Sequence, residues 1–123
     1  MIHSINCSLI NYDESSQALL QQYIRRAGCR EFSWPASPMK YTDENSPLLH
    51  SDLIFLHLTS PEEVVQTELV SLLRQHSGVV ITSPFPRHQF LDLFIQPFAF
   101  LAEPFSFAQF NKCLTAYYQL IQQ

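Results

Sequence analysis

The chain has 123 residues, a length that suits a single domain (1–123) with an ordinary hydrophobic core. Its net charge is −4 and it contains no basic run, which argues against nucleic-acid binding because phosphate contacts need clustered Lys and Arg. No apolar stretch reaches the length of a membrane span and no signal peptide is visible, so we expect a cytoplasmic protein that does not enter a membrane.

The first part of the chain predicts a strand, a helix and a second strand. We expect the first strand at 5–10, a helix that starts at Asp13, and a weaker strand at 29–34. The next stretch, 35–47, contains three prolines and predicts a loop, with a short helix at 43–50 as a further prediction.

The middle of the chain repeats this pattern. We expect a third strand at 52–57, a helix from Ser60 to about His76, and a fourth strand at 79–83. Ser60 is followed by a proline and two glutamates, which are residues favoured at a helix start. The fourth strand is mostly apolar, as expected for a parallel strand that is covered on both faces.

The last part predicts a short aromatic helix at 86–95, a fifth strand at 98–102 and a final helix capped by Ser106. Strands that alternate with helices predict a parallel sheet wound by right-handed crossovers. We therefore expect the α/β class, with a central five-stranded parallel sheet between two layers of helices.

Residues 52–61 read Asp-Leu-Ile-Phe-Leu-His-Leu-Thr-Ser-Pro, a buried strand with a polar residue, His57, at its carboxyl end. This segment resembles the phosphoacceptor strand of response-regulator receiver domains, which usually reads Asp-Leu-Ile-Phe-Leu-Asp-Ile-x-Met-Pro. In open α/β sheets, ligand chemistry takes place at the carboxyl ends of strands. His57 stands where the family has its acceptor aspartate.

A second match lies near the end of the chain, where 100–106 read Phe-Leu-Ala-Glu-Pro-Phe-Ser. This segment is similar to the Tyr-Leu-Leu-Lys-Pro-Phe-Ser ending of receivers that belong to LytTR-type regulators. The resemblance runs from Ile5 to about Ile121. It implies a (βα)5 flavodoxin-like fold (CheY-like) with strand order 2-1-3-4-5 and a cis peptide bond before Pro104.

The resemblance also implies a phosphorylation pocket in which several residues are changed. Tyr12 replaces the first acidic residue of the family, His57 the acceptor aspartate and Glu103 the lysine, whereas Ser83 keeps a hydroxyl group at the end of the fourth strand. Asp13 is the only remaining match to a metal ligand, and it suits a helix N-cap better. Because Mg²⁺ requires several oxygen ligands, we expect no magnesium and no other cofactor.

Two of these changes fit each other. The family's aspartate and lysine lie side by side. Here the two positions carry His57 and Glu103, so the acidic and the basic residue have exchanged places. We expect these side chains to hydrogen-bond and to hold the pocket in one state. No nucleophile or oxyanion motif accompanies them, so the sequence does not predict an enzyme.

Aromatic residues are concentrated in the last third of the chain and form either a rich core or an interface. The interface hypothesis predicts a homodimer, or docking of a protein partner, through the fourth helix, fifth strand and fifth helix. Its candidate residues are Phe90, Phe94, Phe100, Phe107 and Tyr118.

The sequence therefore predicts a degenerate receiver (pseudo-receiver) of two-component signalling, which acts as a dimerisation or docking module. One alternative is an active phosphoacceptor that uses an atypical residue such as His57. Another is the N-terminal part of a LytTR-type transcriptional regulator. An unrelated flavodoxin-like domain would need a phosphate-binding loop, and two glycines in the whole chain argue against one.

Overall fold

The computed structural model describes residues 5–34, 51–65, 67–91 and 93–121, and the structural statements below concern these residues. The short helix predicted at 43–50 lies outside them. In chain order the elements are β1 (Asn6–Ile10), α1 (Glu14–Arg26), β2 (Arg30–Trp34), β3 (Leu53–His57), α2 (Thr67–Arg74), β4 (Val79–Ser83), the 3-10 helix η2 (Arg87–Gln89), β5 (Ala99–Ala102) and α3 (Phe107–Ile121).

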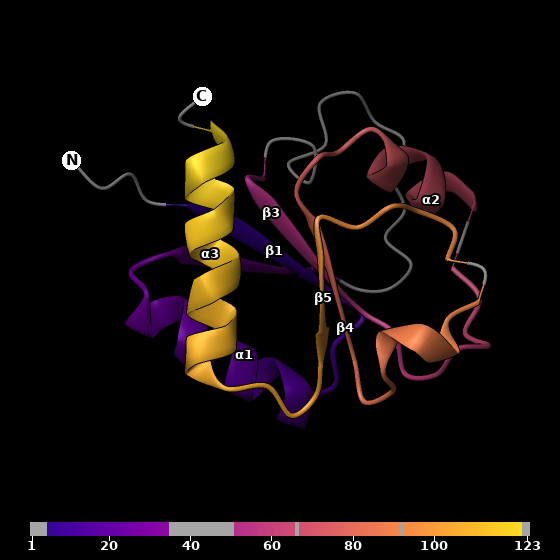
Figure 1. Cartoon of the computed structure of the whole chain (residues 1–123), viewed down its shortest axis with the longest axis horizontal. Coiled ribbons are helices and arrows are strands. Elements are labelled where there is room, and N and C mark those ends of the chain that lie inside the picture. Colours follow the sequence, from indigo (N-terminus) through magenta and orange to yellow (C-terminus); the bar gives the residue numbers. More distant parts are fainter. Residues whose placement is uncertain (1–4, 35–50, 66, 92, 122–123) are drawn as a thin grey trace.

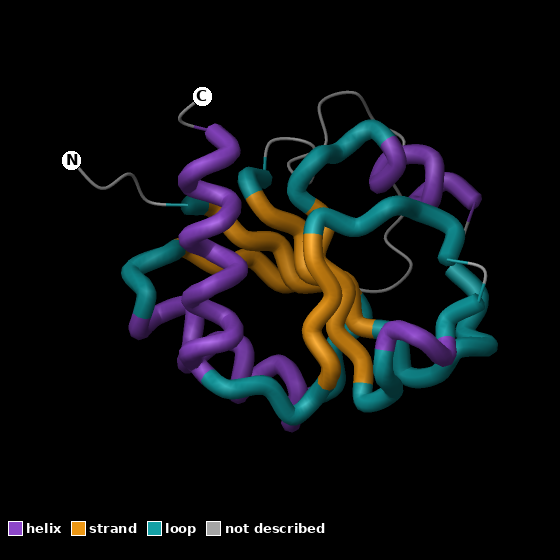
Figure 2. Tube along the Cα trace, in the orientation of Figure 1, coloured by secondary structure: helices purple, strands orange, loops and turns teal. Residues whose placement is uncertain are grey.

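The five strands form one parallel sheet in the order β2-β1-β3-β4-β5, so the predicted class and strand order are confirmed (Figure 2). Every residue of β3 and β4 is buried. Central parallel strands are covered on both faces, which explains why these two segments are almost continuously apolar.

Helices cover both faces of the sheet (Figure 1). Helices α1 and α3 pack on one face, where Phe55 of β3 stacks on Phe110 of α3 with 5.9 Å between ring centroids. On the opposite face, Ile54 and Leu56 pack in a second cluster with Leu69 and other residues of α2. Alternate side chains of a strand point to opposite faces, and β3 therefore supplies both cores.

The starts of the two long helices are capped as the sequence predicts. Asp13 accepts a hydrogen bond from the backbone N–H of Ser16 at the start of α1, and Gly28 follows its last turn with a φ of +79°. At the start of α3, the Ser106 hydroxyl accepts from the N–H of Gln109, whose side-chain oxygen accepts from the N–H of Ser106. These reciprocal bonds form a capping box.

The helix predicted from Ser60 is wrong at its start, because α2 begins at Thr67. The carboxylate of Glu63 accepts hydrogen bonds from both the N–H and the hydroxyl of Thr59, at 2.6 and 2.8 Å. These bonds close a turn over 59–63 instead of a first helical turn. The chain then continues without helical structure to 65.

The helix predicted at 86–95 is also wrong, because the described residues of that stretch, 86–91 and 93–95, form only η2. Two arginine side chains bind carbonyl groups of this segment: Arg87 donates to the carbonyl of Phe90 at 3.1 Å, and Arg74 donates to that of Phe94 at 2.9 Å. Carbonyls that bind side chains do not need the hydrogen bonds of a helix. Within the described parts of the chain, no helix is both long and apolar enough to cross a membrane.

Candidate functional site

Four side chains meet at the carboxyl edge of the sheet. Tyr12 follows β1, His57 ends β3, Thr82 lies near the end of β4, and Glu103 follows β5. His57 is the register partner of Thr82 in the neighbouring strand. Because all strands are parallel, their carboxyl ends share one edge, where ligands of open α/β sheets bind.

His57 is the centre of this cluster and is only 2% exposed. Its Nδ1 atom lies 3.4 Å from Oε1 of Glu103 and 3.4 Å from Oγ1 of Thr82. The ring of Tyr12 stacks on the imidazole with 5.0 Å between centroids and 30° between planes. The structure thus brings His57 and Glu103 together, and it adds two neighbours that the sequence analysis did not assign to this pair.

Tyr12 joins the cluster through its hydroxyl as well as its ring. The hydroxyl lies 2.6 Å from Oγ1 of Thr82, within hydrogen-bonding distance. Burial raises the pKa of the Tyr12 phenol well above its ordinary value, so the phenol stays protonated. Thr82 therefore links Tyr12 to His57, and the interior of the cluster is filled by protein groups.

The hydroxyl group beside His57 belongs to Thr82, which the sequence analysis did not single out. Ser83 is buried, and its Oγ accepts a hydrogen bond of 3.1 Å from the N–H of Phe85. Consecutive strand residues point to opposite faces, so a shift of one residue exchanges a side chain that faces His57 for one that does not. The register of β3 against β4 was the missing information.

Two residues that the sequence analysis did not single out fix the loops around His57. Asn11 has a φ of +69°, in the left-handed region that asparagine tolerates better than most residues. Its side-chain amide donates to the carbonyl of His57 at 2.8 Å and to the carboxylate of Glu63 at 2.5 Å. Glu63 also accepts the two bonds from Thr59. These hydrogen bonds of Asn11 and Glu63 connect the loop after β1 to the loop after β3.

Asp13 and Pro104 complete the predicted site. Asp13 is exposed, and the hydrogen bond from the backbone N–H of Ser16 lowers its pKa, as expected for a helix N-cap. The Glu103–Pro104 peptide bond is cis, in agreement with the prediction from the sequence.

The residues at this edge do not fit a magnesium ion, which prefers near-octahedral oxygen coordination. The carboxylate of Asp13 caps α1, that of Glu63 is held by three hydrogen bonds, and that of Glu103 lies beside His57. In the described ranges, no group of three or more His, Cys, Asp or Glu side chains is placed to hold a metal ion.

The aromatic residues proposed for an interface are mostly involved in packing. Phe90 is only 5% exposed and packs on Phe100 with 5.3 Å between centroids, so most of its ring belongs to the core. Phe107 is half-buried under the guanidinium of Arg26, which lies 4.1 Å from the ring centroid. Phe94, Phe100 and Tyr118 are also half-buried.

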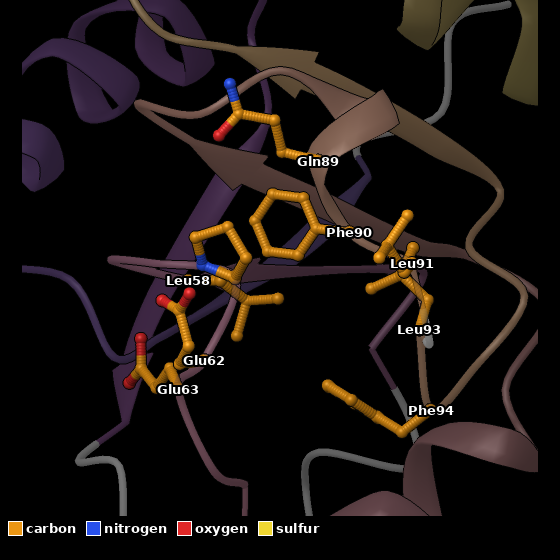
Figure 3. Close-up of a pocket in the computed structure, with 9 residues that line it drawn as sticks. Leu58, Glu62, Glu63, Gln89, Phe90, Leu91, Leu93 and Phe94 are labelled. Carbon is orange, nitrogen blue, oxygen red and sulfur yellow. The ribbon is translucent and has the colours of Figure 1, made fainter.

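A separate pocket of about 230 Å³ lies between the loop after β3 and the segment around η2 (Figure 3). Leu58 and Phe90 lie at its centre, and the side chains of Glu62 and Glu63 lie at one end. Tyr12, His57, Thr82 and Glu103 do not line it.

Comparison with known proteins gives a match at the level of structure. No protein-family model and no curated protein matches the sequence. The receiver domain of a LuxO repressor protein from Vibrio parahaemolyticus aligns over 98% of this chain and 94% of its own, with a TM-score of 0.69 and 16% identity. The magnesium-bound receiver domain of the sensor histidine kinase PA1611 from Pseudomonas aeruginosa covers 94% of this chain and 98% of its own, with a TM-score of 0.66 and 15% identity.

Another similar structure is the pseudo-receiver domain of the CikA protein, which covers 93% of this chain and 97% of its own, with a TM-score of 0.62 and 16% identity. These comparisons support receiver domains as a whole and do not single out those of LytTR-type regulators. With its parallel sheet in the order β2-β1-β3-β4-β5, the chain has the fold of the response-regulator receiver domains.

Proposed function

We propose that this domain is a degenerate receiver that acts in two-component signalling through protein contacts and is not phosphorylated by the usual aspartyl route. The observation that carries this proposal is the environment of His57. A buried imidazole ends β3, and its Nδ1 atom already lies near both Thr82 and Glu103.

Electrostatics support the loss of phosphotransfer. A phosphoryl group on the side chain at the end of β3 would bring negative charge close to the carboxylate of Glu103. Two like unit charges about 4 Å apart repel by roughly 4 kcal/mol at an effective dielectric constant of about 20. The chain supplies no lysine at this position to offset that repulsion.

The donor set supports a function without Mg²⁺. In the similar structure of PA1611, a magnesium ion is coordinated in the active-site cleft. Here the corresponding edge of the sheet presents an imidazole, a phenol and carboxylates that already have protein partners. We therefore propose no cofactor and no enzymatic reaction for this domain.

The proposed role is that of a constitutive interaction module in the cytoplasm, which binds a protein partner or a second copy of itself. The surface that we propose for a homodimer is formed by β5 and α3. The exposed ends of Leu120 and Ile121 on α3, which are 45% and 50% exposed, provide apolar surface there. The net charge of −4 disfavours a nucleic acid as the partner.

The test is incubation of the intact domain with acetyl phosphate and Mg²⁺, followed by intact-mass spectrometry. We expect no phosphoryl adduct on the natural protein. The double variant His57→Asp with Glu103→Lys, which restores the acceptor and the lysine of the family, serves as the comparison. A stoichiometric adduct on the natural protein that is lost in His57→Ala would overturn the proposal and make position 57 a phosphoacceptor.

A further inference from the structure

The pocket beside η2 has a size that selects the kind of occupant (Figure 3). Its volume of about 230 Å³ is below the range of roughly 300–1,000 Å³ that is typical of small-molecule sites. Pockets that receive one large side chain of a partner are common at the centres of protein interfaces, where such anchors provide most of the binding energy. The volume therefore favours a side-chain anchor over a metabolite.

One end of the pocket is apolar and is continuous with the surface. Leu91, Leu93 and Phe94 lie there, and Phe90 and Leu58 lie between them and the acidic end (Figure 3). Leu91 is 89% exposed, whereas Phe90 is 5% exposed. A single exposed leucine is unremarkable on most surfaces, but one on the rim of an apolar pocket can cover an inserted side chain.

The other end of the pocket is acidic. Glu63 is fixed there by hydrogen bonds from Thr59 and Asn11. Glu62 is exposed and makes no hydrogen bond or ion pair with the described residues. The nearby arginines, Arg74 and Arg87, donate to backbone carbonyls of the apolar segment. The carboxylate of Glu62 thus remains available to a cation from outside the domain.

We propose that this pocket docks a segment of a partner protein in which a large apolar side chain lies next to Lys or Arg. The apolar side chain would insert between Leu91 and Phe90, and the cation would meet Glu62. A second copy of this chain is a poorer occupant, because it carries 11 acidic residues against 7 Lys and Arg. This inference rests on the proposed role as a docking module and adds the location and the chemistry of the partner.

The test is selection of a random peptide display library on the intact domain, followed by binding measurements on the enriched peptides. We expect them to combine Leu, Ile, Met or Phe with Lys or Arg. Because truncation of an anchoring residue commonly costs more than about 1 kcal/mol, Leu91→Asp and Glu62→Lys should each weaken binding roughly fivefold or more. Gln22→Lys, which adds a positive charge at an exposed position of α1 on the other face of the sheet, is the control and should leave binding unchanged.

Three outcomes would overturn the inference: enriched peptides without a basic residue, binding that persists in both variants, and no enrichment relative to the Leu91→Asp/Glu62→Lys double variant. Concentration-dependent dimerisation that Leu91→Asp abolishes would also overturn it, because the occupant would then be a second copy. Both substituted side chains are exposed, so a thermal melt should show that the variants remain folded. The acetyl phosphate assay is independent of these results and tests the degenerate pocket by itself.

Discussion

The hydroxyl of Tyr12 lies 2.6 Å from Oγ1 of Thr82, and both residues also contact His57. This relationship connects the loop after β1 to the end of β4 through neutral groups. It fills the edge of the sheet where ligands of open α/β folds bind. The structural basis of the proposed inactivity is thus a set of contacts within the protein and not only the loss of an aspartate.

The hydrogen bond between Tyr12 and Thr82 can be measured with a double-mutant cycle. We expect Tyr12→Phe and Thr82→Val each to lower the free energy of unfolding by about 1 kcal/mol, a typical net value for one intramolecular hydrogen bond. The double variant should lose less than the sum, because the second change removes a bond that is already broken. Urea unfolding measures all four proteins, and strictly additive losses would contradict the bond.

The buried phenol of Tyr12 predicts a loss of stability at high pH. Burial raises its pKa in the folded protein, whereas a tyrosine in the unfolded chain titrates near about 10. Above that pH the unfolded state releases the proton and the folded state retains it, so the free energy of unfolding falls as pH rises.

This pH effect is measured by urea unfolding from pH 8 to pH 11 on the natural protein and on Tyr12→Phe. Tyr117 and Tyr118 also have raised pKa values and remain in both proteins, so the difference between the two curves isolates Tyr12. The variant should have the shallower decline. Parallel curves would show that Tyr12 does not keep its proton.

Glu62 and Glu63 are adjacent in sequence but should differ strongly in their effect on stability. Glu63 accepts three hydrogen bonds from Thr59 and Asn11, and bonds to a charged acceptor contribute about 1.5–3 kcal/mol. We therefore expect Glu63→Ala to destabilise the domain by about 1–3 kcal/mol, after allowance for partial exposure. Glu62→Ala, at an exposed site, should change stability by less than about 0.5 kcal/mol. If Glu63→Ala and Glu62→Ala lowered stability equally in thermal or urea unfolding, the hydrogen bonds from Asn11 and Thr59 to Glu63 would be refuted.

The two glycines of the chain provide a matched pair for a further test. A methyl group at Gly78 would overlap the backbone oxygen of Asp52, whereas one at Gly28 would meet open space. Gly28 has a φ of +79°, so alanine there should cost about 1–2 kcal/mol of backbone strain. Gly78→Ala should cost more, because backbone must move to relieve the overlap. Urea unfolding of both variants checks this order, which the reverse ranking would disprove.

Local signals in the sequence were sufficient for much of the fold. The strand at 79–83 was predicted with its observed bounds, because a buried central strand is almost uniformly apolar. The caps at Asp13 and Ser106 were also predicted, since capping depends on residues within one helical turn. The helices at 60–76 and 86–95 were misjudged because Glu63, Arg74 and Arg87 form hydrogen bonds that compete with helical ones.

By itself, the sequence determined that a histidine and a glutamate occupy two positions at strand ends, because residue identity and strand pattern are local properties. The tertiary structure decided which groups surround them. Strand register turned Thr82 rather than Ser83 toward His57, and the fold brought Tyr12 over the imidazole ring. The pocket beside η2 likewise arises only from contacts between distant loops. Such relationships depend on pairing between residues far apart in the chain, which local sequence patterns do not encode.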